Sequence, residues 1–140
     1  MTEVQSPGRD APLVDVAGLA AKLDQFANER DWTQFHSPKN LVMALTGEVG
    51  ELNEIFQWMS EAASVKAGTD TQTAQAVQDE LADVLLYLVR LSSVLGVDLN
   101  TAVQQKLRTN ELRYPADKVR GSSQKARRDD ANVPPGANPK

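Results

Sequence analysis

The sequence predicts an all-α protein with four helices in a bundle-like arrangement, and three observations support this fold class. Apolar residues recur at three- and four-residue spacing in four segments, as they do on one face of an amphipathic helix. No segment alternates apolar and polar residues over the length of a strand. Prolines, glycines and helix-capping residues fall between the periodic segments, where helices would begin and end.

The length and composition predict one helical domain with a modest core. The chain has 140 residues, of which 41% are hydrophobic, and this is enough to fold as a single unit. We expect the domain to span residues 14–120. Residues 1–13 and 121–140 are polar and rich in proline and glycine, which predicts a disordered lead-in and a mobile tail.

The first two predicted helices are separated by a short loop. The first should run from about residue 14 to 30, and its apolar face carries Leu19, Leu23 and Phe26. Residues 31–37 break the helical spacing. Ser37 and Pro38 form a good N-cap and first-turn pair, so the second helix should begin there and continue to about Met59.

The third and fourth predicted helices follow a connection over residues 60–70. The third should run from about residue 71 to 95 and end at Gly96 in a left-handed conformation. Its main apolar stripe comprises Val77, Leu81, Val84, Leu88, Leu91 and Leu95. Asp98 is a candidate cap for the fourth helix, which should end near Arg113, shortly before Pro115.

Acidic residues in the second helix interrupt an otherwise apolar face. Glu48 lies within the stripe that should face the core, and Glu51 lies one turn further along at its edge. An ionised carboxylate is costly to bury without a partner. Gly47 and Gly50 stand directly beside the two glutamates and each lowers helix propensity by roughly 1 kcal/mol relative to alanine. The bare backbone there leaves room for a ligand.

The third helix carries a second acidic pair, Glu80 and Asp83. If the second and third helices pack antiparallel, as a short connection favours, the two pairs can converge. Four carboxylates form a site suited to Mg²⁺ or Mn²⁺. A di-iron centre is disfavoured because it requires Glu-x-x-His, and the only histidine is His36 in a loop. The alternative is that each pair is simply a solvated helix face.

Cationic and aromatic residues suggest a polyphosphate ligand. The inward stripe of the fourth helix changes from apolar to Lys106, Asn110 and Arg113, which indicates contact with an anion. The alternative is that this helix end leaves the core and its cations interact with the helix dipole. Three aromatic residues offer stacking surface for a base, although each could also be core or interface packing. They are Trp32, Trp58 and Tyr87.

Two motifs together resemble a known family. Glu48-Val-Gly-Glu51 and Glu80-Leu-Ala-Asp83 resemble the E-x-x-E…E-x-x-D signature of the all-α, MazG-like nucleoside triphosphate pyrophosphatases. The surrounding residues are similar to the dCTP pyrophosphatase branch. They are Glu29-Arg-Asp-Trp-Thr-Gln-Phe-His36, Phe56-Gln-Trp58, Asp83-Val-Leu-Leu-Tyr-Leu-Val89 and Arg113-Tyr-Pro115.

The resemblance implies roles for individual residues. It implies that Glu48, Glu51, Glu80 and Asp83 are the catalytic residues and bind magnesium. It also implies that Lys106, Asn110 and Tyr114 contact phosphates or sugar, and that Trp32, His36, Trp58 and Tyr87 shape the nucleoside pocket. One position departs from the pattern, because a histidine late in the first helix reaches the base in the animal enzymes and Leu23 stands there in this chain.

The implied reaction is Mg²⁺-dependent hydrolysis of a (deoxy)nucleoside triphosphate, dCTP or a related dNTP, between its α- and β-phosphates. The metal would neutralise phosphate charge and activate water, and Glu51 is our preferred general base. The alternative from another class is a non-catalytic helical interaction protein whose acidic stripe is a docking surface. Metal-dependent release of pyrophosphate separates the two.

The remaining expectations concern partners, location and assembly. A net charge of −4 disfavours a nucleic-acid surface. With no cysteine, disulfides and thiolate sites are excluded. No apolar run is long enough to cross a membrane, so we expect a cytoplasmic protein. The third helix is apolar nearly all round between Leu81 and Leu91, which predicts burial against another chain. The dCTP branch implies a homotetramer.

Overall fold

The computed structural model describes residues 13–125, and every regular element in that range is helical. The all-α prediction is therefore confirmed. Residues 1–12 of the expected lead-in and residues 126–140 of the expected tail lie outside the described range. The described residues divide into two compact units, one formed by residues 15–99 and the other by residues 13–14 with 100–125.

The larger unit contains three long or medium helices and two short turns of helix. Helix α1 (Ala17–Glu29) is followed by the 3₁₀ turn η1 (Thr33–Phe35), α2 (Pro38–Phe56), the short α3 (Glu61–Ser64) and α4 (Ala74–Leu95). The three predicted helices in this unit match α1, α2 and α4. The connection expected over residues 60–70 contains α3 as well, because Ser60 caps it by accepting a hydrogen bond from the Ala63 N–H at 3.1 Å.

Two predicted helix ends have the expected chemistry. The Ser37 hydroxyl accepts a hydrogen bond from the Asn40 N–H at 3.2 Å, and Pro38 is the first residue of α2. A proline is tolerated at that position because its missing N–H would have no partner inside the helix. Gly96 ends α4 with φ +67°, a left-handed conformation that glycine adopts without steric cost.

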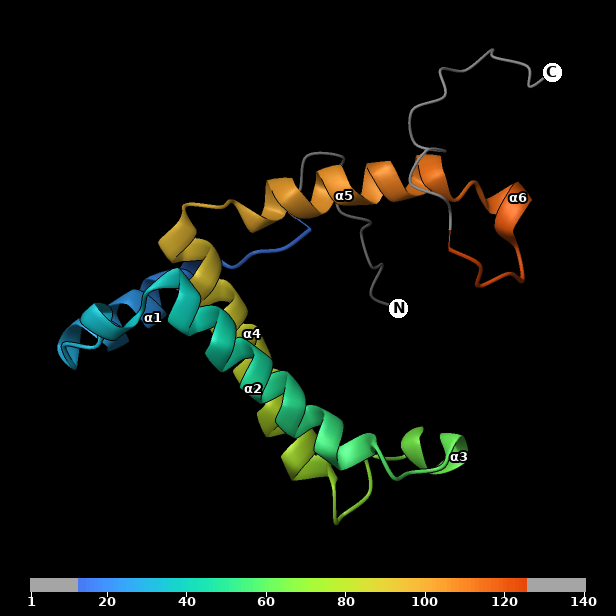
Figure 1. Cartoon of the computed structure of the whole chain (residues 1–140), viewed down its shortest axis with the longest axis horizontal. Helices are drawn as coiled ribbons and strands as arrows, with labels where there is room; N and C mark the ends of the chain where they lie inside the picture. The colour runs from blue at the N-terminus through green and yellow to red at the C-terminus, as the bar shows by residue number, and fades with distance from the viewer. Residues whose placement is uncertain (1–12, 126–140) are drawn as a thin grey trace, which may run out of the picture. The chain divides into compact units, whose positions relative to one another are not determined.

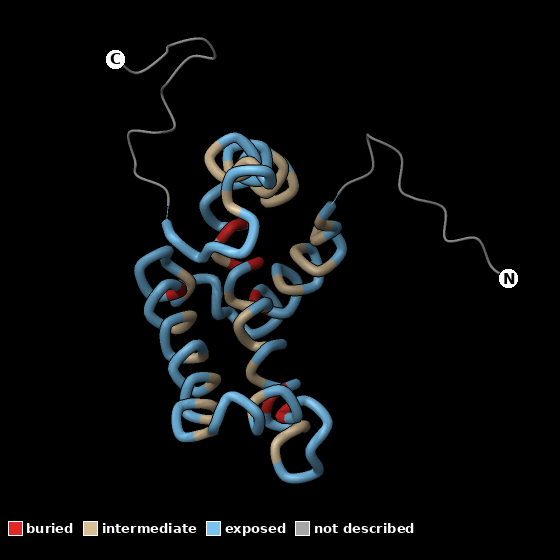
Figure 2. The backbone as a smooth tube through the Cα atoms, turned by 90° about the vertical axis from the view of Figure 1, so that its right-hand side faces the viewer, coloured by how far each residue is buried: buried red, intermediate tan, exposed pale blue. Residues whose placement is uncertain are grey.

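Helices α2 and α4 form the central antiparallel pair of this unit (Figure 1). Helix α1 packs against α4 as well. The buried residues are few and scattered along the backbone, as the red positions in Figure 2 show, and only five of those described are apolar. They are Ala27, Leu41, Ala67, Val77 and Val89. A core this small leaves much apolar surface uncovered.

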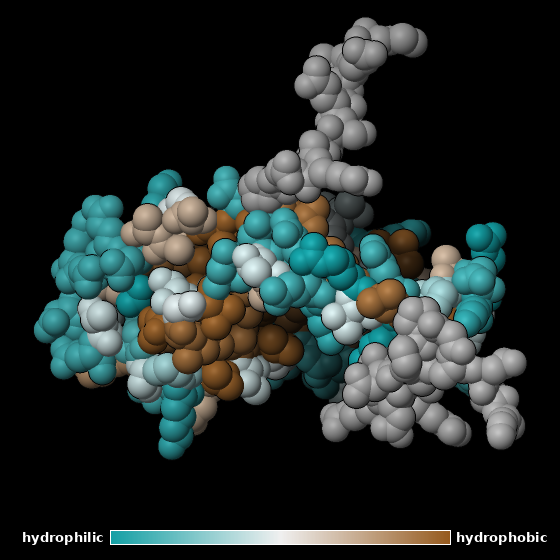
Figure 3. All heavy atoms as spheres, turned by 90° about the horizontal axis from the view of Figure 1, so that it is seen from above, coloured by the Kyte–Doolittle hydropathy of each residue, from teal (hydrophilic) through white to brown (hydrophobic). Residues whose placement is uncertain are grey.

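Several leucines of α4 that were expected to face the core are exposed. Leu81, Leu88 and Leu95 remain 53%, 40% and 53% exposed, and the neighbouring Leu85 is 46% exposed. Helices α1 and α2 cover only part of the circumference of α4, so these side chains are only partly covered within the unit. Figure 3 also shows apolar side chains gathered on one face of the described residues.

The smaller unit consists of residues 13–14, α5 (Leu99–Arg113) from its second residue onward, and α6 (Ala116–Val119). The Leu13 and Val14 N–H groups donate to Asn100 Oδ1 at 2.9 and 3.3 Å. The fourth predicted helix corresponds to α5. Among the described residues, no helix is both long and apolar enough to cross a membrane.

Candidate functional site

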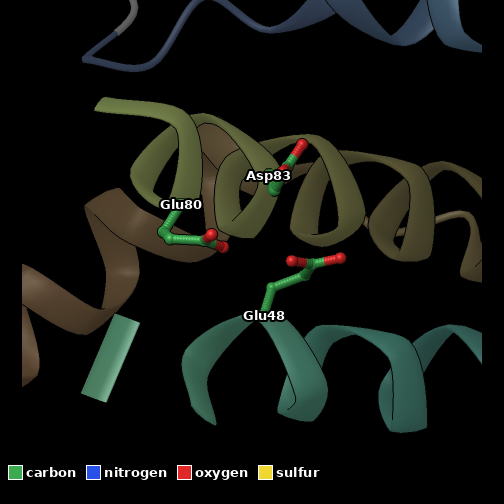
Figure 4. Close-up of side chains that lie close together, drawn as sticks. All are labelled: Glu48, Glu80 and Asp83. Atoms are coloured by element: carbon green, nitrogen blue, oxygen red, sulfur yellow. The ribbon is translucent and has the colours of Figure 1, made fainter. Parts of the chain in front are cut away.

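Three carboxylates converge between α2 and α4. Carboxylate oxygens of Glu48, Glu80 and Asp83 lie within 4.8 Å of one another. Glu80 and Asp83 are three residues apart and therefore share one face of α4, while the antiparallel packing brings Glu48 across from α2. Figure 4 shows the Glu48 and Glu80 side chains extending into the space between the two helices.

The fourth predicted carboxylate, Glu51, lies at the edge of this cluster. Its side chain is exposed, but its charge contributes to raising the pKa of both Glu48 and Glu80. For Glu48, partial burial is the largest cause of the raised pKa, followed by repulsion from Glu51 and Asp83. For Glu80, burial is again the largest cause, followed by repulsion from Glu51 and Glu48. The cluster therefore resists carrying its full negative charge.

One oxygen of the cluster indicates what this site could bind. Glu80 Oε2 is inaccessible to solvent and has no hydrogen-bond partner among the described residues. An unsatisfied buried acceptor is costly and uncommon. A divalent cation would satisfy this oxygen and relieve the repulsion between the carboxylates. The donor set, all carboxylate oxygen, is of the kind that Mg²⁺ and Mn²⁺ prefer.

The two glycines of α2 leave open space beside the cluster. A Cβ added at Gly47 or Gly50 would meet no atom within 4 Å. Packing among residues 13–125 therefore does not require glycine at either position. The space beside Glu48 and Glu51 is available to a ligand, as the sequence predicts.

An aromatic pocket adjoins the carboxylates. It has a volume of about 160 Å³ and is open to solvent on one side, and Asp83 belongs to both the pocket and the cluster. The rings of Phe26 and Trp32 meet edge to face with their centroids 5.7 Å apart. The lining residues are Leu23, Phe26, Trp32, His36, Asp83, Leu86, Tyr87 and Arg90. Three predicted nucleoside-binding residues, Trp32, His36 and Tyr87, thus lie together.

Arg90 was not foreseen as a site residue. Its guanidinium is buried, with Nη1 donating to Asp24 Oδ1 at 3.0 Å and Nε donating to His36 Nδ1 at 3.1 Å. Partial burial and, second, the Arg90 charge lower the pKa of His36, which favours the neutral imidazole. The sequence did contain a signal, because Arg90 is a lone charge within the apolar run from Val84 to Leu95.

The other predicted site residues lie outside this pocket lining. Trp58 follows the end of α2 and is 89% exposed. The residues expected to bind phosphate belong to the smaller unit, where Lys106 is exposed and three others are half-buried. The half-buried residues are Asn110, Arg113 and Tyr114. The Arg113 guanidinium lies 5.9 Å from the centroid of the Tyr114 ring.

The fold and the site define a class of protein, namely an all-α chain with a carboxylate cluster between two antiparallel helices and an aromatic pocket beside it. The model of the MazG-like family matches residues 44–128 of this sequence, and these include the cluster. The chain belongs to the MazG-like family, which confirms the family resemblance.

Individual relatives agree with this assignment. The chain is 45% identical to human (Homo sapiens) dCTP pyrophosphatase 1 over 88% of its length and 74% of the human protein. It is 52% identical to the dCTP pyrophosphatase 1 of Rattus norvegicus over 79% of its length, but spans only 64% of that protein. A crystal structure of a pyrophosphatase from Archaeoglobus fulgidus matches with a TM-score of 0.65 and 37% identity. That match covers 70% of this chain and 90% of the archaeal one.

Proposed function

We propose that this protein is a nucleoside triphosphate pyrophosphohydrolase that cleaves a (d)NTP to the monophosphate and pyrophosphate. The proposal rests above all on the three carboxylates within 4.8 Å of one another and on the unsatisfied Glu80 oxygen among them. The relatives named dCTP pyrophosphatase 1 support dCTP or a related dNTP as the substrate. Removal of such nucleotides from the cellular pool is the corresponding role.

We propose Mg²⁺, with Mn²⁺ as a substitute, as the cofactor held by Glu48, Glu80 and Asp83. When bound, such a cation neutralises charge on the phosphates and lowers the pKa of water. The fit rests on the carboxylate donor set and the buried, unsatisfied Oε2 of Glu80. Glu51 completes the acidic group from its edge.

Glu51 is our candidate for the general base. It is exposed and outside the tight group of three, so its carboxylate can accept a proton from the attacking water while its neighbours serve as ligands. It is also close enough to affect the pKa of two of those neighbours. In-line attack at the α-phosphorus would expel pyrophosphate.

The remaining substrate contacts follow from the residue types. The Trp32 and Tyr87 rings would hold the base beside His36, and Asp83 connects this pocket with the acidic cluster. Lys106, Asn110, Arg113 and Tyr114 would contact phosphates or sugar, since two are cationic and two offer neutral donors. The catalytic domain on this view comprises residues 14–120.

We propose that the enzyme works as a homotetramer in the cytoplasm. The exposed leucines of α4 and the 89% exposed ring of Trp58 are surfaces that a neighbouring chain would cover. A partner could also place its own Trp58 beside this chain's pocket. Substrate would then bind between chains.

Product analysis tests the proposed reaction. Purified full-length protein is incubated with each common NTP and dNTP, with Mg²⁺, Mn²⁺ or chelator, and the products are separated by chromatography. We expect monophosphate and pyrophosphate in equal amounts, only with metal. Release of orthophosphate, or no turnover of any nucleotide, would refute the proposal. A helical docking protein would give the second result.

A pair of variants on α4 provides the matched control. Asp83→Asn should abolish pyrophosphate release, whereas Asp79→Asn should not. Both remove one negative charge from the same helix, but Asp79 is exposed and its Oδ1 accepts a hydrogen bond from Gln75 Nε2 at 2.9 Å. Equal activity in the two variants would exclude Asp83 from catalysis.

A further inference from the structure

Arg90 is a charged residue buried in the wall of an aromatic pocket. Its side chain is only 6% exposed, whereas its ion-pair partner Asp24 is 58% exposed. Taking a guanidinium out of water is costly, and an ion pair with a well-solvated carboxylate returns little of that cost. A brace between α1 and α4 could be built at the surface without this burial. The buried position of Arg90 therefore requires another explanation.

A count of donors shows what Arg90 has left to offer. A guanidinium carries five N–H groups and accepts no hydrogen bond. Nη1 donates to Asp24 and Nε donates to His36, while Nη2 has no partner within residues 13–125. Since Arg90 lines the pocket, its two Nη2 N–H groups, together with the second N–H of Nη1, remain for a ligand.

The same contact fixes the proton on His36. Because Arg90 Nε can only donate, His36 Nδ1 must accept, and the proton of the neutral ring must then be on Nε2. The lowered pKa of His36 favours this neutral form. His36 also lines the pocket, so it presents an N–H donor of defined tautomer.

We propose that Arg90, positioned by Asp24, and His36 form a donor pair that selects cytosine over uracil and thymine in this pocket. This inference rests on the proposed function and goes beyond it, because it assigns base selection to residues outside the catalytic motifs. Arg90 both contacts the base through Nη2 and positions His36.

The chemistry of the bases explains the selection. Cytosine presents two adjacent acceptors, O2 and N3, whereas uracil and thymine present an N3–H donor at the second position. Two fixed N–H donors can both bond to the O2 and N3 acceptors of cytosine, whereas one of them would face the N3–H donor of uracil or thymine. A site built around such hydrogen bonds rejects the mismatched ligand strongly, because buried donors are then left unpaired.

The spacing along α4 fits a nucleotide. Asp83 and Arg90 are seven residues apart and both line the pocket, so they lie two helical turns apart on one face, about 10 Å along the axis. The base would lie by Arg90, and the phosphates would extend toward the acidic cluster at Asp83. One helix thus positions both ends of the substrate.

Comparison of dCTP with dUTP tests the inference, because these nucleotides differ only in the base edge at issue. The measured quantity is the ratio of kcat/KM values for pyrophosphate release, dCTP over dUTP, in Mg²⁺. We expect the unmodified protein to favour dCTP. Arg90→Met should lower the ratio roughly tenfold or more, the loss of about one charged hydrogen bond, mainly through KM for dCTP. Lys22→Met, which removes an exposed cation of α1, should leave the ratio unchanged.

A pair of His36 variants separates base contact from structural support. Asn in place of His36 keeps an acceptor near the Nδ1 position but lacks the distal N–H, whereas Gln places an amide N–H near the Nε2 position. We expect His36→Asn to lose discrimination at unchanged thermal stability and His36→Gln to recover part of it. If Arg90→Met fails to fold, these variants decide the question.

Failure of the inference and failure of the proposed function give different results. A protein that releases no pyrophosphate from any nucleotide refutes both. Active protein that treats dCTP and dUTP alike, or whose ratio is the same in Arg90→Met and both His36 variants, refutes the donor pair alone. A His36→Gln variant no better than His36→Asn would remove the Nε2 donor from the explanation.

Discussion

Replacing Glu48 by glutamine should separate the catalytic role of the acidic cluster from any structural role. The substitution keeps the size of the side chain and removes one charge from three carboxylates that lie within 4.8 Å of one another. If the cluster is a metal site, the metal-free variant should be at least as stable as the unmodified protein and inactive. If Glu48 serves mainly to support the fold, the variant should be less stable.

The size of the stability change follows from the geometry. Two unit charges 4.8 Å apart, the largest separation within this cluster, repel each other by about 0.9 kcal/mol in water. Physiological salt reduces this to about 0.5 kcal/mol. Loss of the repulsion between Glu48 and Asp83 alone should therefore raise Tm by about 1–4 °C in a chain of 140 residues. Burial of the charged Glu48 carboxylate, which raises its pKa, is also costly, and a neutral glutamine avoids this cost, so this effect raises Tm as well.

Thermal unfolding with and without metal provides the assay. In chelator, Glu48→Gln should unfold at or above the Tm of the unmodified protein, and added Mg²⁺ or Mn²⁺ should stabilise only the unmodified protein. The control is Glu54→Gln, which removes an exposed charge from the same helix. It should keep both the metal-induced shift and turnover. An unfolded Glu48→Gln protein, or one that keeps its activity, would refute the assignment.

Three further predictions concern pH, phosphate binding and assembly. In chelator, the free energy of unfolding should fall as pH rises from about 4.5 through the raised pKa values of Glu48 and Glu80. The reason is that the folded state keeps protons that the unfolded chain has already released. Urea unfolding at several pH values should show this fall, and the fall should be smaller in Glu48→Gln. Lys106→Met should fold normally but bind a non-hydrolysable dCTP analogue roughly tenfold more weakly, as measured by calorimetry, because a charge-assisted contact is lost. Arg108→Met, which removes another exposed cation of α5, should bind the analogue as tightly as the unmodified protein. Equal affinities in the two variants would mean that Lys106 is a solvent-exposed residue without a role in binding. Light scattering of dilute, active protein should show a homotetramer whose activity falls on dissociation, and a fully active monomer would exclude this state.

Local sequence signals accounted for the helices because the forces involved are local. Ser37 and Pro38 start α2, and Gly96 ends α4 in the conformation that glycine favours. The convergence of Glu48 with Glu80 and Asp83 was also within reach of the sequence. It follows from helical periodicity together with the antiparallel packing that a short connection favours.

The polar wall of the pocket could not be predicted in this way. Arg90 contacts Asp24 and His36, which lie 66 and 54 residues away in the chain. No spacing rule relates residues on different elements at such distances. The sequence shows only that Arg90 is an isolated charge in an apolar run. Its partners become visible once α1 and the loop before α2 are packed against α4.

The arrangement of α4 connects the site with the expected assembly. Asp83, Tyr87 and Arg90 line the pocket at steps of four and three residues, so they occupy one face of the helix. The exposed Leu81, Leu85 and Leu88 have the same spacing but begin two residues earlier. Two residues correspond to a rotation of about 200°, so this second set lies on the opposite face. A neighbouring chain packed on these leucines would contact α4 on the face away from the pocket, whether or not another neighbour also contributes its Trp58 to the pocket. Assembly would then stabilise the helix that positions both the carboxylates and the base-reading donors, and its loss would weaken catalysis even where no site residue is removed.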